Sequence, residues 1–195
     1  MEKSKRQMQK ELTKEKIINS AFEICSENGF AVSTDAIAKH AGVAHGTIFT
    51  HFPKADVLLS CLVRKFGDSI EKTLSDVSLS WGGIDEFLEF HVGILEEYEQ
   101  FYSKLIAETT SLPKDAQSVI HNIQSSFESR FSEVITRGVE EKVIRRLPAN
   151  ILFNTWVGLL HYYMQNKERF APGGSVLKRY KKQLIFTFCE LIRRI

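Results

Sequence analysis

Apolar residues recur every three or four positions along most of the chain, which is the spacing of one face of a helix. Strand-like alternation does not persist over any long stretch, so the sequence predicts an all-α protein. About nine helices are expected, over residues 13–28, 34–41, 44–52, 55–79, 84–99, 101–110, 112–143, 149–166 and 175–194. Thr13 is expected to cap the first helix, and residues 1–12 are expected to fray.

The stretch 33–52 reads STDAIAKHAGVAHGTIFTHF and contains two short helical patterns on either side of Gly42. Two short helices joined by a glycine-containing turn are typical of a helix-turn-helix motif, whose second helix enters the DNA major groove. Ile48 and Phe52 would pack inward, because a helix this short is not stable alone. The outward residues are then small, neutral or hydrogen-bonding, which suits contact with base edges: His45, Gly46, Thr47, Phe49 and Thr50.

Composition fits a globular chain, with 43% hydrophobic and 26% charged residues. The formal net charge of +2 says little about partners. Residues 1–55 hold 8 Lys/Arg against 6 Asp/Glu, so the basic excess is N-terminal but small. Most of those cations precede Ile17, namely Lys3, Lys5, Arg6, Lys10, Lys14 and Lys16.

Cys25, Cys61 and Cys189 are far apart and lack metal-ligand spacing, so we expect small buried side chains in a reducing cytoplasm. His40, His45 and His51 raise the alternative of a metal site. They fall on helices of different direction and no cysteine or carboxylate completes a set, so no metal and no cofactor are expected. A signal peptide and a membrane span are not expected either, which favours a cytoplasmic protein without membrane contact.

An enzyme is the alternative from another functional class. The chain shows no phosphate-binding glycine loop, no HExxH zinc motif and no GxSxG nucleophile turn. Histidine, aspartate and serine occur, but not at a spacing that indicates a catalytic triad. We therefore expect that the protein is not an enzyme.

Aromatic residues are frequent in the predicted helices after residue 60. Individually such residues are expected in a core, but pockets for small molecules in helical proteins are mostly apolar and lie between helices. A pocket is therefore predicted among Phe66, Phe87, Phe90, His91, Phe101, Phe127, Phe131 and Trp156, with a first choice of Phe66, Phe87, His91, Phe101, Phe127 and Trp156.

The last two predicted helices carry more apolar surface than one chain needs, because residues 149–166 are apolar nearly all round. Two such pairs would form a four-helix bundle across a two-fold axis, so a homodimer is expected. The predicted dimer interface consists of Trp156, Leu160, Tyr163, Leu184, Phe188 and Leu191.

The helix-turn-helix region resembles the signature of the TetR (tetracycline-repressor-like) family over roughly residues 11–70. The similarity consists of Ile37, Ala38, Ala41, Gly42, Val43, Gly46, Thr47, Ile48, Phe49, His51 and Phe52, followed by Leu58 and Leu59. The remainder of the chain resembles the family only in helix number, length and the apolar last pair.

The resemblance implies a DNA-contacting set of Thr34, His45, Gly46, Thr47, Phe49, His51 and Lys54. Phe49 departs from the family, which often has a phosphate-contacting tyrosine there, and it lacks the hydroxyl. Ala55 stands where the family usually has lysine. Lys54 precedes it by one residue and is expected to contact phosphate in its place.

The resemblance also implies two domains, a DNA-binding domain over residues 1–54 and an effector-binding and dimerisation domain over residues 55–195. The expected function is a transcriptional regulator, a repressor that a small apolar ligand releases from a palindromic operator in double-stranded DNA. The alternative on the same fold is a DNA-binding or adaptor protein that responds to no ligand.

Overall fold

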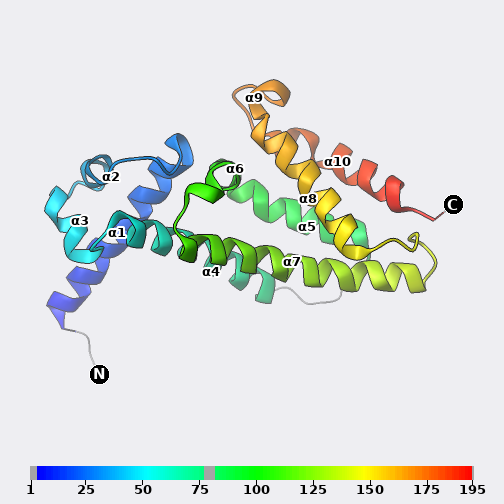
Figure 1. The fold of residues 1–195 in the computed structure, drawn as a ribbon, viewed down its shortest axis with the longest axis horizontal. Coiled ribbons are helices and arrows are strands. Elements are labelled where there is room, and N and C mark those ends of the chain that lie inside the picture. Colours follow the sequence, from blue (N-terminus) through cyan, green and yellow to red (C-terminus); the bar gives the residue numbers. More distant parts are fainter. Residues whose placement is uncertain (1–3, 77–81, 195) are drawn as a thin grey trace. The chain divides into compact units, whose positions relative to one another are not determined.

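The computed structural model describes residues 4–76 and 82–194, and this part of the chain folds into ten α helices, as the all-α prediction expects (Figure 1). A short 3-10 turn, Thr109–Ser111, follows α6. The helices are α1 (Lys5–Asn28), α2 (Thr34–His40), α3 (His45–His51), α4 (Ala55–Asp76), α5 (Ile84–Glu97), α6 (Glu99–Glu108), α7 (Lys114–Glu140), α8 (Ala149–Gln165), α9 (Lys167–Phe170) and α10 (Val176–Ile192).

The first helix begins much earlier than predicted. Ser4 caps it, since its side chain accepts a hydrogen bond from the Gln7 N–H at 3.3 Å. Thr13, the predicted cap, donates its hydroxyl to the Gln9 carbonyl at 2.9 Å and lies inside the helix. The prediction was wrong because residues 5–12 have good helix propensity but no apolar face.

The structure also contains one helix that the sequence did not predict. The four-residue helix α9 was not expected, because it is too short to show a periodic pattern. The helix expected over residues 55–79 is observed as α4, which the structure describes over Ala55–Asp76. The predicted end of this helix, from Val77 to Leu79, lies outside the described residues.

The chain divides into two compact units. The first consists of the described residues up to Ser69 together with Gln100–Ile120, and the second of the described parts of Ile70–Glu99 and His121–Ile195. Both α4 and α7 begin in the first unit and end in the second. The predicted functional boundary between residues 54 and 55 remains a prediction.

Aromatic packing forms the core of the first unit around Phe101 of α6. The Phe101 ring stacks on Phe22 of α1 at 4.3 Å and contacts Phe66 of α4 at 5.1 Å and Phe30 at 5.4 Å, as distances between ring centroids. This cluster joins three helices and the connector after α1, so α6 is part of the unit that carries the helix-turn-helix.

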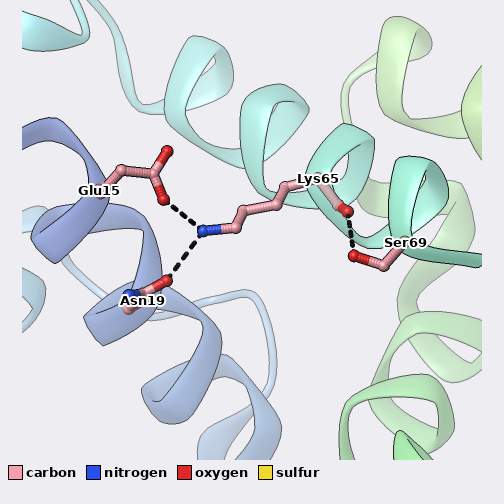
Figure 2. A network of polar contacts seen from close by, with 4 residues as sticks. All are labelled: Glu15, Asn19, Lys65 and Ser69. Carbon is pink, nitrogen blue, oxygen red and sulfur yellow. Dashed lines mark hydrogen bonds and ion pairs between the residues drawn. The ribbon is translucent and has the colours of Figure 1, made fainter. Parts of the chain in front are cut away.

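Polar contacts also join α1 to α4 (Figure 2). The ammonium group of Lys65 on α4 forms an ion pair with Glu15 and donates a hydrogen bond to the Asn19 side chain at 3.0 Å. Ser69, one turn further along α4, donates to the Lys65 carbonyl at 3.0 Å. Both partners of Lys65 are on α1, so the long helix is held beside the predicted DNA-binding helices.

The second unit has its core where α5, α7, α8 and α10 meet. Phe131 of α7 contacts Phe153 at 5.4 Å, Phe87 at 5.9 Å and Phe188 at 6.2 Å, as distances between ring centroids. The ring centroids of Trp156 and Phe188 are 5.3 Å apart, and Trp156 is fully buried. The predicted last pair, α8 and α10, does pack together.

Candidate nucleic-acid interface

Helix α3 has one buried face and one exposed face. Ile48 is completely buried and Phe52, just after the helix, is 1% exposed, so these residues anchor it. His45, Gly46 and Thr50 are exposed, Thr47 is half-buried and the Phe49 ring is 43% exposed. The exposed face therefore carries the residues predicted to approach base edges.

The turn before α3 depends on Gly42. Its φ of 58° lies in the left-handed region, which glycine adopts without steric cost. The Gly42 N–H donates to the Lys39 carbonyl at 3.1 Å, and the Val43 N–H donates to the Ala38 carbonyl at 3.0 Å. These bonds satisfy carbonyls at the end of α2 and set the direction in which α3 starts.

Thr34 and His45 meet across the two helices. The Thr34 hydroxyl and His45 Nε2 are 2.9 Å apart, a hydrogen bond whose donor depends on the imidazole tautomer. The His45 ring also packs edge-on against Phe49, with 5.2 Å between ring centroids. Three of the predicted DNA-contacting side chains therefore form one preformed group on the surface of α2 and α3.

His51, at the end of α3, lies in a basic environment that sequence reasoning missed. Partial burial, and then the charges of Lys10 and Lys14, lower the pKa of His51 from its ordinary value. The Lys14 ammonium also lies over the Phe52 ring, 5.8 Å from its centroid. Lys10 and Lys14 are one helical turn apart on α1, and the cluster of cations before Ile17 was the available signal.

Lys54 is exposed in the connector between α3 and α4. Its carbonyl accepts from the Val57 N–H at 3.1 Å, so Lys54 lies at the start of α4. A cation beside free backbone N–H groups at a helix N-terminus suits contact with a phosphate.

The predicted effector-pocket residues fall into two groups. Phe66 and Phe101 lie in the aromatic core of the first unit, whereas Phe87, His91, Phe127 and Trp156 lie in the second. In the second group the Trp156 indole N–H donates to His91 Nδ1 at 3.1 Å, and the His91 ring stacks on Phe127 at 4.3 Å. All six are buried, and their role as a pocket remains a prediction.

His91 is a neutral imidazole. Burial, and then the nearby His161, lower the pKa of His91 to about 3, and burial lowers the pKa of His161 to about 4. Since an indole N–H only donates, Nδ1 of His91 must be the acceptor and its proton is on Nε2. The Nε2–H group of His91 is thus a neutral donor with a fixed tautomer among aromatic rings.

Most of the predicted dimer residues are buried inside one chain. Trp156, Leu160, Leu184 and Phe188 are each at most 4% exposed, so they belong to the protomer core and offer no surface to a second copy. Tyr163 is half-buried and Leu191 is 54% exposed. Besides Leu191, the large apolar side chains that α8 and α10 expose are Ile151, Tyr162 and Phe186, which were not predicted.

The three cysteines are free thiols, and burial raises the pKa of Cys25 to about 12. Within the described ranges, no group of three or more histidine, cysteine or acidic side chains could hold a metal ion. The Nε2 atom of His40 lies 3.7 Å from a carboxylate oxygen of Glu23. The same part of the chain contains no helix long and apolar enough to cross a membrane.

Fold and surface together define a helix-turn-helix DNA-binding protein with a second helical unit. Residues 17–60 match the family model of bacterial regulatory proteins of the tetR family. Residues 84–165 match the model of the tetracyclin repressor-like C-terminal domain. The chain belongs to the TetR family of DNA-binding transcriptional regulators.

Individual relatives agree with this assignment. The chain is 26% identical over 175 residues to the fatty acid metabolism regulator protein of Bacillus subtilis, covering 83% of this chain and 90% of the relative. It is 34% identical over 89 residues to the transcriptional repressor KstR of Mycolicibacterium smegmatis, covering 45% of this chain and 43% of that protein. The solved structure of the regulator FadR from Bacillus subtilis in complex with stearoyl-CoA has a TM-score of 0.65 and 20% identity, covering 91% of this chain and 98% of that one.

Proposed function

We propose that the protein is a homodimeric, cytoplasmic repressor that binds a palindromic operator and releases it when a long-chain acyl ligand binds. The preformed surface of α2 and α3 is the observation that carries this proposal. Its anchoring side chains are buried, while its outward side chains are free to meet a partner.

In this proposal α3 enters the major groove with its N-terminal half against base edges. Thr47 contacts a thymine methyl or a base edge, and Gly46 allows a close approach of the backbone. Phosphate contacts come from His51 and Lys54, and from Lys10 and Lys14 on α1. Thr34 orients His45 through their hydrogen bond.

The dimer in this proposal uses the exposed faces of α8 and α10. Ile151 and Tyr162 on α8, and Phe186 and Leu191 on α10, are each more than half exposed. Exposed apolar side chains gathered on two packed helices are typical of an interface with a second copy. Residues 1–54 would then bind DNA and residues 55–195 would bind the effector and form the dimer.

The effector class comes from the relatives. One is a regulator of fatty acid metabolism, and a structural neighbour was solved with stearoyl-CoA. The aromatic group around His91 suits such a ligand, because His91 supplies a neutral donor among apolar rings. Binding would tilt α4 and change the spacing of the two α3 helices, with a coupling of about 1–3 kcal/mol, or about 5–150-fold in operator affinity.

Two variants test the assignment of the DNA-contacting face. Thr47→Ala should relax base preference, because a base contact is lost, whereas His51→Ala should weaken binding to all duplexes alike. Competition between the selected operator and random duplexes, followed by fluorescence anisotropy, separates these effects. If both variants keep the wild-type affinity and base preference, the assignment of the DNA-contacting face is wrong.

A further inference from the structure

A cationic cavity, open to solvent, lies where the loop between α7 and α8 meets the end of α10, and its four cationic side chains are exposed. Its volume is about 500 Å³, and four of its lining side chains are cations against one carboxylate. We call it the basic cavity, and its charged lining residues are Lys142, Arg145, Arg146, Arg194 and Glu140. All belong to the second unit, far along the chain from the helix-turn-helix.

The backbone around the basic cavity is fixed by hydrogen bonds between two distant segments. The Arg145 N–H donates to the Ile192 carbonyl at 2.9 Å, and the Arg194 N–H donates to the Val143 carbonyl at 3.0 Å. These bonds form an isolated antiparallel bridge between Ile144 and Arg193, and Ile144 is buried beneath it. Arg145 and Arg194 are therefore brought together by the fold and not by adjacency in sequence.

The four cations have no carboxylate partner within 4 Å in the part of the chain that the structure describes. The ends of α7 and α10 meet at this point, and the partial negative charge of helix C-termini attracts some positive charge. That attraction acts within the last turn of a helix, whereas Arg145 and Arg146 lie in the connector between α7 and α8.

Lys142 strengthens the case for a ligand. Its φ of 62° makes it the one non-glycine residue with left-handed backbone in the described ranges. Glycine would occupy this conformation at lower cost, so the lysine side chain is present despite a local conformational penalty. The Lys142 side chain adds a fourth cation to a cavity that three arginines already line.

We propose that the basic cavity binds a small anion with two or more phosphate groups, such as a nucleoside diphosphate or the phosphorylated head of coenzyme A. Guanidinium groups bind phosphate oxygens in pairs with a planar geometry, and several arginines on one hollow match a ligand with several phosphates. The cavity volume falls within the range of small-molecule sites, about 300–1,000 Å³. The proposal uses no residue of the proposed DNA or effector sites, so it does not rest on the proposed function.

Isothermal titration calorimetry on the full chain tests it, with pyrophosphate, ADP, coenzyme A and adenosine as ligands. Pyrophosphate, ADP and coenzyme A should bind and adenosine should not. Arg145→Gln combined with Arg146→Gln should weaken binding at least about tenfold, because charge-assisted hydrogen bonds are lost. Lys178→Gln combined with Lys182→Gln removes two exposed cations elsewhere on α10 and should leave the affinity unchanged.

Lys142→Gly is a second variant that removes a cation without disturbing the fold, because glycine suits the local backbone. It shows whether weaker binding could be due to misfolding. It should weaken pyrophosphate binding while leaving the melting temperature unchanged or raised. Equal affinity for ADP and coenzyme A would assign the site to the shared diphosphate, and tighter binding of coenzyme A would assign it to that head group. The proposal fails if pyrophosphate and ADP do not bind, if the Lys178/Lys182 variant loses as much affinity, or if the arginines affect only duplex DNA binding.

Discussion

Gly46 lies on the exposed face of α3, and a methyl group built on its backbone would meet no heavy atom of the chain within 4 Å. Its backbone is helical, so no left-handed conformation explains it, in contrast to Gly42. Glycine inside a helix costs about 1 kcal/mol relative to alanine. The chain's own packing does not require a glycine here, and in the proposed DNA-binding mode the missing side chain leaves room for the close approach of DNA.

Replacement of Gly46 by alanine should therefore separate stability from DNA binding. Gly46→Ala should raise the free energy of unfolding by up to about 1 kcal/mol and weaken operator binding about tenfold or more, because the methyl group occupies the approach surface. Urea unfolding and fluorescence anisotropy measure the two quantities. Gly93→Ala is the matched control, since Gly93 is also helical with open space around it and should leave DNA affinity unchanged. Undiminished operator affinity in Gly46→Ala would contradict the assigned face.

His91 makes stability depend on pH. Its pKa falls from about 6.5 in an unfolded chain to about 3 in the folded one, so the unfolded state binds more protons between these values. The contribution of His91 to the free energy of unfolding is therefore fully present above about pH 6.5 and decreases as the pH falls. By pH 5 about 2 kcal/mol of it is lost. His91→Gln keeps an acceptor for the Trp156 N–H but does not titrate. Urea unfolding at pH 7.5 and pH 5 should show a smaller loss in the variant, and equal losses would refute the assignment.

A hydrogen bond holds the end of helix α6 against the connector that follows α1. The Glu108 carboxylate accepts from the Phe30 N–H at 2.9 Å. Gly29 has a φ of 83°, and a Cβ atom there would lie 2.2 Å from Glu108 Oε1. The carboxylate can approach the chain this closely because residue 29 has no side chain, and the Phe30 ring packs edge-on against Phe101 of α6.

A double-mutant cycle at Gly29 and Glu108 tests this contact. Gly29→Ala should destabilise the wild-type protein by more than about 1–2 kcal/mol, because left-handed strain adds to the displacement of Glu108. In a Glu108→Ala background the same change should cost only the strain, so the two substitutions should couple. Thermal unfolding of the four proteins gives the coupling energy. Strictly additive effects would show that Glu108 does not fill the space beside Gly29.

Sequence patterns located α2 and α3 well, because Ser33 and Gly42 are local signals that a cap and a turn each need. They could not find the first two turns of α1, which are exposed on all sides, and so missed that Lys10 lies near enough to His51 to lower its pKa. On α8 they could not decide which apolar residues face inward, since apolar side chains occur nearly all round it. Burial of Trp156 and exposure of Tyr162 follow from long-range packing, which periodicity does not contain.

At the scale of the whole molecule, the helices around Phe101 form one unit with the helix-turn-helix, and the second unit holds His91 and the exposed faces of α8 and α10. The small basic excess of the first 55 residues suggests that one copy alone would bind DNA weakly. Two copies on a palindrome would combine their phosphate contacts, which makes dimerisation part of DNA binding.

Operator titration with and without stearoyl-CoA tests whether a long-chain acyl ligand controls operator binding. Anisotropy of an operator selected from random duplexes should show affinity that falls steeply with salt. Saturating stearoyl-CoA should weaken it about 5–150-fold, and coenzyme A without the acyl chain should not. If calorimetry shows that stearoyl-CoA binds more tightly than coenzyme A, so that the acyl chain itself is bound, and operator affinity stays the same, a long-chain acyl ligand does not control operator binding.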